Sequence, residues 1–206
     1  MVGHTSIEGA TPIPNTAIFL KRTTIEFLQI LFSARAAGSY HYDHDENITE
    51  IQISDQHVTD LEAYHTRPAI VGVRGPLSWQ GMGLGGGAFE GQNRLTGKQT
   101  FNDLLTGSMA FSCISREGIE AENLAHLVFN SFKFFRPILQ KYGFFTIKSL
   151  NIGGESLIVT DGVHDDLYIV PVYITAQIQD RWTLDDTAAR QLEQIIIETL
   201  TCSIGV

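Results

Sequence analysis

The stretch from Gly107 to Gly143 constrains the fold of this chain more than any other. Met109, Phe111 and Cys113 alternate with small or polar residues, a pattern typical of a strand with one buried face. Acidic residues follow, and apolar side chains then recur on one face at helical spacing. That face comprises Leu124, Leu127, Val128, Ser131, Phe135, Leu139 and Tyr142. The pattern predicts a half-buried strand that leads into a long amphipathic helix.

Local signals predict where this helix begins, bends and ends. Ser115 is a favourable N-cap residue, so we expect the helix to start there. Pro137 has no backbone N–H to donate, which predicts a kink or restart between Phe134 and Arg136. Gly143 is a natural residue just beyond the helix C-terminus.

The remaining patterns predict a single α+β domain over residues 1–206. After an N-terminal arm (1–14), a helix is expected at 15–36. Its polar side is narrow, so it needs neighbours on more than one side, either from its own core or from other subunits. This polar side consists of Arg22, Glu26, Gln29 and Ser33. Apolar or alternating runs predict further strands at 51–53, 68–73, 144–152, 155–160 and 168–178.

Glycine and proline predict how these strands are connected. Gly153 and Gly154 predict a hairpin between the 144–152 and 155–160 strands. Pro171 predicts an edge position or a bulge in the last strand. Trp79 to Gly97 holds seven glycines in nineteen residues, so 79–100 is expected to be a long Gly-rich loop or an extended hairpin. The expected fold is a mixed, mostly antiparallel sheet with helices packed on it.

A second amphipathic helix is predicted at the end of the chain. Thr183 and Asp186 form a variant of the capping box that marks helix starts. The apolar side of this helix comprises Ala188, Leu192, Ile195, Ile196 and Leu200.

Charge and cysteine content exclude several classes of protein. The chain has 14 basic and 23 acidic residues and a net charge of −9, which argues against a broad nucleic-acid-binding face. Cys113 and Cys202 form no metal-binding or disulfide framework. Neither a signal peptide nor a membrane-spanning run is apparent. We expect a soluble protein of the cytoplasm, or of a particle assembled there.

The segment from His41 to Glu46 is the strongest candidate for metal chemistry, with two His and three carboxylates in six residues. It matches no known ligand spacing and lies in a break without helical periodicity, so a solvated loop is the favoured interpretation. The Gly91–Thr100 segment departs from the phosphate-binding loop because five residues separate Gly91 from Gly97. No nucleophile motif is present. We therefore predict no enzyme activity, no catalytic residues, no cofactor and no metal.

Excess aromatic surface is the feature that these patterns leave unexplained. Phe129, Phe132 and Phe134 point in directions around the helix that cannot all face one small sheet. Either the N-terminal helix covers them or a partner does, because large aromatic residues anchor protein interfaces. The candidate subunit-interface residues are Phe129, Phe132, Phe134, Arg136 and Trp79.

A series of sequence motifs extends over more than half of the chain. It comprises Arg67–Val71 with Gly75, Pro76 and Trp79, then Asp103–Met109, Cys113–Glu122, Leu127–Leu139, and Ile169–Val172 leading to Trp182. Together these motifs resemble the neck proteins of tailed bacteriophages. The best match among these is the tail terminator, also called the tail-completion or head–tail joining protein.

The resemblance implies a structural virion protein that forms a ring, expected to be a hexamer, at the head-proximal end of the tail. Such a ring terminates the tail tube and joins it to the head. The implied partners are other copies of the chain, the tail tube protein and the head–tail connector protein. DNA would pass through the channel without specific binding, and no membrane is involved. The family has no catalytic residues to carry over, and assembly would take place in the host cytoplasm.

Two alternatives stay open. The chain could be another neck or baseplate component, such as a head-completion connector or an adaptor. A more remote alternative is a metal-dependent enzyme that uses the His41–Glu46 cluster.

Overall fold

The computed structural model describes residues 16–34, 40–45, 47–55, 67–80, 88–92, 99–141, 144–158 and 166–184. Two compact units can be distinguished within the chain. One comprises 15–78 and 105–178, and the other comprises 1–14, 79–104 and 179–206. The single-domain organisation stays a prediction. The predicted N-terminal arm and the predicted C-terminal helix lie outside the described residues.

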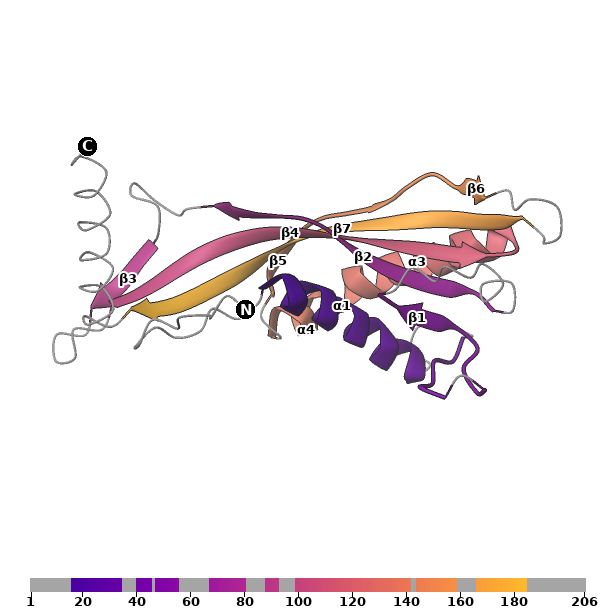
Figure 1. The fold of residues 1–206 in the computed structure, drawn as a ribbon, viewed down its shortest axis with the longest axis horizontal. Helices are drawn as coiled ribbons and strands as arrows, with labels where there is room; N and C mark the ends of the chain where they lie inside the picture. The colour runs from indigo at the N-terminus through magenta and orange to yellow at the C-terminus, as the bar shows by residue number, and fades with distance from the viewer. Residues whose placement is uncertain are drawn as a thin grey trace, which may run out of the picture. The chain divides into compact units, whose positions relative to one another are not determined.

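The fold class predicted from the sequence is confirmed, because a mixed sheet is combined with helices (Figure 1). The elements are α1 (Thr16–Ser33), β1 (Gln52–Ser54), β2 (Ala69–Gln80), β3 (Ala88–Gln92), β4 (Gln99–Ser115), α3 (Gly118–Phe134), α4 (Arg136–Lys141), β5 (Phe144–Ile152), β6 (Ser156–Ile158) and β7 (Leu167–Leu184). The strands follow the order β1-β2-β4-β7-β5, with β3 paired to β4 and β6 paired to β7. The β1–β2 pair is parallel, whereas β5 and β6 both run antiparallel to β7.

The main core of the 15–78 and 105–178 unit lies between the helices and one face of the sheet. Alternate residues of β4 and β7 supply the sheet side of this core, as the sequence pattern predicted. These residues are Met109, Phe111, Cys113, Val170, Val172, Ile174, Ala176 and Ile178. Leu20, Leu28 and Phe32 of α1 are at most 1% exposed and supply part of the helix side. Burial of each such side chain contributes about 1.5–3 kcal/mol, which fixes α1 along this face.

The predicted start of the helix that follows β4 is wrong by two residues, because Ser115 was expected to be its N-cap residue. α3 begins at Gly118, with Glu117 as its N-cap residue and no capping bond from the Glu117 side chain. Ser115 instead ends β4, and its hydroxyl oxygen accepts the Glu117 N–H at 3.3 Å. The predicted break at Pro137 is confirmed, because α3 ends at Phe134 and α4 restarts at Arg136. Pro137 thus occupies the first turn of a helix, where a missing N–H costs little.

The predicted hairpin at Gly153 and Gly154 is wrong. β5 and β6 do not pair with each other, because both pair with β7 along one line. Ile152 pairs with Val172, and the next pair along is Ser156 with Ile169, so the β5–β6 side holds one additional residue. This bulge lies opposite Pro171, whose carbonyl accepts the Gly153 N–H at 2.7 Å. The prediction for Pro171 is therefore wrong, because β7 lies between β4 and β5 rather than at an edge, and the additional residue belongs to the partner strands rather than to β7.

The unit that contains residues 79–104 includes a short antiparallel pair. Phe89 pairs with Phe101 and Gln92 with Gln99, and the register shifts between Phe89 and Gly91. The extended hairpin predicted at 79–100 is therefore the alternative that the described residues support. Residues 81–87 and 93–98 lie outside the described part.

Candidate functional site

Among the predicted interface residues, Phe132 belongs to the core of the protein. Its side chain is 1% exposed. The ring lies 5.4 Å from that of Phe111 on β4 and 5.1 Å from that of Phe27 on α1, centroid to centroid. The N-terminal helix covers this residue, so its assignment to an interface is wrong. Phe129 is half-buried and packs against the same core.

The other three predicted residues are at the surface. Phe134 is 68% exposed at the end of α3 and Trp79 is 53% exposed in β2. Arg136 is exposed at the start of α4, and its guanidinium donates a hydrogen bond to the Thr146 hydroxyl at 2.7 Å. The structure places Phe134 and Arg136 at the α3–α4 junction. Trp79 belongs to the other compact unit.

An apolar groove lies beside this junction, between α1 and α4. It has a volume of about 300 Å³ and is lined from α1 by Thr23, Glu26, Phe27, Ile30, Leu31 and Ala34. Phe135, Ile138 and Leu139 line it from the other side. Ile30 is 70% exposed and Ile138 is 42% exposed, so large aliphatic groups face solvent here. Concave apolar surfaces of this size are where proteins usually bind partners or ligands.

The helix break creates the second wall of this groove. The restart after Phe134 ends α3 and begins a separate short helix, and α4 supplies Ile138 and Leu139. The sequence predicted the break and the wide apolar arc of α1. It did not predict Ile30 or Ile138 as site residues, because the groove depends on how α1 and α4 pack.

Charge around the groove is unevenly distributed. Among the described residues that line it, Glu26 is the only carboxylate, and Arg22 neutralises it through an Nε–Oε1 contact of 2.6 Å. Residues 133–141 include three basic side chains and no acidic one. All three, Lys133, Arg136 and Lys141, are exposed. In this acidic protein, the stretch that supplies Phe135, Ile138 and Leu139 to the groove is therefore basic.

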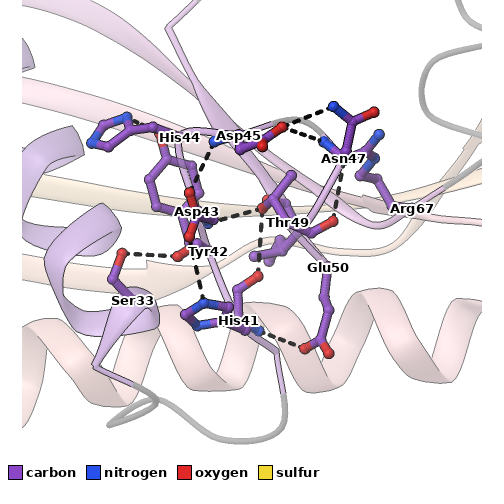
Figure 2. Close-up of polar contacts among 11 residues, drawn as sticks. Ser33, His41, Tyr42, Asp43, His44, Asp45, Asn47, Thr49, Glu50 and Arg67 are labelled. Carbon is purple, nitrogen blue, oxygen red and sulfur yellow. Dashed lines mark hydrogen bonds and ion pairs between the residues drawn. The ribbon is translucent and has the colours of Figure 1, made fainter.

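The loop from Tyr40 to Glu50 contains the candidate metal cluster, and its polar groups form hydrogen bonds with one another and with the loop backbone (Figure 2). The Asp43 carboxylate accepts the Asp45 N–H at 2.9 Å. The Asp45 carboxylate accepts both the backbone and the side-chain N–H of Asn47, each at 2.9 Å. Glu50 accepts the His41 N–H at 2.8 Å. These bonds hold a tight turn, which is the usual role of Asp and Asn in such a loop.

The two histidines of this loop do not share a site. The His44 Nδ1 atom lies 3.3 Å from the Tyr42 hydroxyl, whereas the His41 Nε2 atom lies 3.9 Å from an Asp43 carboxylate oxygen. Within the residues described by the structure, no three His, Cys, Asp or Glu side chains are grouped to hold a metal ion. Glu46 lies outside those residues. The solvated-loop interpretation is therefore the one that the described contacts favour.

A partly buried polar cluster joins this loop to the start of α3. The Tyr40 hydroxyl donates to the Glu120 Oε1 atom at 2.8 Å, and the Ser115 hydroxyl donates to the other carboxylate oxygen. Burial raises the pKa of Tyr40, and the bond to Glu120 raises it further. Nearby, burial alone raises the pKa of the fully buried Cys113 thiol. Cys113 is thus an inert core thiol, as its place in the strand pattern predicted.

Comparison with known proteins assigns no family to the chain. No model of a known protein family matches it, and no curated protein sequence is significantly similar. Among the helices that the structure describes, none is long and apolar enough to cross a membrane.

Proposed function

We propose that this chain is a structural subunit of a phage neck. It forms a ring at the head-proximal end of the tail, terminates the tail tube and joins it to the head connector. The ring is built from copies of this chain, expected to be six. Its partners are the tail tube protein and the connector, and DNA passes through its channel without specific binding.

The observation that carries this proposal is the solvent-exposed apolar groove between α1 and α4. A ring needs two different complementary surfaces on each subunit, because head-to-tail contacts close only by rotation. The groove and the adjacent Phe134 supply one such surface, since Ile30 and Phe134 are 70% and 68% exposed. The α+β fold and the motif resemblance agree with a small ring-forming subunit.

The first experiment measures assembly of the full chain. Native mass spectrometry is expected to give a ring-sized species, and electron cryomicroscopy of the virion is expected to locate the chain at the junction of head and tail. Density for the chain at the distal end of the tail would identify a baseplate component and overturn the proposal. Monomer in solution together with absence from the virion would also overturn it.

A matched pair of variants tests whether the groove is responsible. Ile138→Asp places a charge in the groove, whereas Ile119→Asp places it on the first turn of α3 outside the groove, at a residue 77% exposed. We expect Ile138→Asp to abolish the ring species and Ile119→Asp to leave it intact. Circular dichroism and thermal unfolding monitor the fold of both variants. A normal ring in the Ile138→Asp variant would remove the groove from the proposal.

A further inference from the structure

Ile30 and Ile138 in the α1–α4 groove are 70% and 42% exposed, and the chemistry of the groove restricts what could fill it. Its walls are mostly apolar. Glu26, the one carboxylate among the described lining residues, is paired with Arg22, and the 133–141 stretch that supplies one wall is basic. An occupant must therefore present an apolar stripe flanked by acidic groups.

We propose that the occupant is the C-terminal segment 185–206 of a neighbouring copy of this chain. The segment would lie in the groove as an amphipathic helix, with its apolar stripe on Ile30 and Ile138. This inference rests on the proposed ring function and adds the contact that links one subunit to the next.

The apolar pattern of the segment fits such a groove. Ala188, Leu192, Ile195, Ile196 and Leu200 fall on one side at the spacing of helix-in-groove ligands. From 188 to 200 a helix extends about 18 Å, whereas the α1 wall from Thr23 to Ala34 extends about 16 Å. The stripe is thus long enough to cover the whole α1 wall.

The charges of the two surfaces are complementary. The segment has four acidic residues and one basic residue, a net charge of −3. Glu193 and Glu198 lie on either side of the apolar stripe at helical spacing. The 133–141 stretch beside the groove has a charge of +3 from Lys133, Arg136 and Lys141. Opposite charges at the border of an apolar contact fix its register and speed its formation.

The two surfaces in this contact, the C-terminal segment and the groove, are different from each other, as a ring of identical subunits requires. A segment on one copy and a groove on the next make a heterologous contact, which generates a ring when the rotation closes. Every subunit then uses its segment once and its groove once.

Photo-cross-linking of the full chain identifies the occupant directly. A photoreactive amino acid replaces Ile138, with replacement of Ile119 as the control outside the groove, and heavy-isotope-labelled and unlabelled copies are mixed before assembly. We expect mass spectrometry to find cross-links from position 138 to residues 185–206, in pairs that combine the two isotopes. Cross-links to another segment, cross-links within one copy, or no cross-link from position 138 would each overturn the inference.

A second pair of variants separates this inference from the proposed function. Leu192→Asp interrupts the apolar stripe, whereas Gln194→Asp places the same charge on the opposite side of the predicted helix. We expect loss of the ring species for Leu192→Asp and a normal ring for Gln194→Asp. If both variants form rings, the segment is not the occupant and the ring function is unaffected. If the unaltered chain is absent from the neck, the proposed function itself fails.

Discussion

The ring of Phe27 on α1 lies 5.1 Å from the ring of Phe132 on α3, centroid to centroid. Phe27 also contacts Phe135 at 6.0 Å, so one side chain of the N-terminal helix reaches both sides of the break between α3 and α4. This contact places Phe132 inside the core and leaves Phe134, two residues along the helix, outside it.

Truncation of Phe132 and truncation of Phe134 are expected to differ strongly in their effect on stability. Phe132→Ala leaves a cavity beneath α1 and should lower the free energy of unfolding by about 3–5 kcal/mol. Phe134→Ala removes an exposed ring and should change it by less than about 0.5 kcal/mol. Denaturant unfolding of both variants measures the difference. A comparable loss for the two would contradict the burial of Phe132 described above.

Gly107 on β4 is expected to resist substitution because α1 lies close above it. An added Cβ would lie 2.5 Å from Leu20 Cδ2 and 2.9 Å from Leu77 Cδ1. Gly107→Ala should therefore destabilise the fold by about 1–3 kcal/mol. Gly154→Ala is the control, since no atom lies within 4 Å of its added Cβ. We expect this control to be neutral or stabilising by about 0.4–1 kcal/mol, and thermal unfolding compares the two.

The Tyr40–Glu120 hydrogen bond predicts a pH dependence of stability at alkaline pH. Because burial raises the pKa of Tyr40 above its ordinary value, the folded state retains this proton when the unfolded chain has lost it. The stabilisation is fully present below the ordinary tyrosine pKa, about 10, and is lost as pH rises above it. Tyr40→Phe should cost about 1–2 kcal/mol at neutral pH.

The comparison of Tyr40→Phe with the unaltered chain isolates this effect from other titrating groups. Unfolding free energies are measured for both at neutral pH and at successive alkaline values. The gap between the two proteins should narrow as the pH rises. A gap that stays constant through the alkaline range would show that Tyr40 does not carry the effect.

Chelation tests whether the 41–50 loop is held by hydrogen bonds to its own carboxylates rather than by a metal ion. Since Asp43, Asp45 and Glu50 already accept backbone N–H groups, dialysis against EDTA should leave the unfolding temperature unchanged. Elemental analysis of the purified protein should find no stoichiometric metal. If chelation lowered the unfolding temperature and a divalent ion restored it, the result would support the metal-site alternative.

The sequence by itself determined the elements whose periodicity is strong. The alternation through Met109, Phe111 and Cys113 predicted a half-buried strand, and the helical face from Leu124 to Leu139 predicted α3 with a kink or restart between Phe134 and Arg136. These predictions succeeded because burial of one face imposes a repeat of two residues on strands and of 3.6 residues on helices.

Only the tertiary structure decided which aromatic residues are buried and where the site lies. Periodicity placed Phe132 and Phe134 alike beside the core face, but the packing of Phe27 on Phe132 buries one and leaves the other exposed. Tertiary pairing also explains why the prediction of a hairpin at Gly153 was wrong. A glycine pair permits a turn as readily as a bulge, and the pairing of both flanking strands with β7 selects the bulge. The groove formed by Ile30 and Ile138 brings together side chains 108 residues apart in sequence (138 − 30). Local pattern carries no information about such a groove, because it forms only when the fold places α1 and α4 on either side of it.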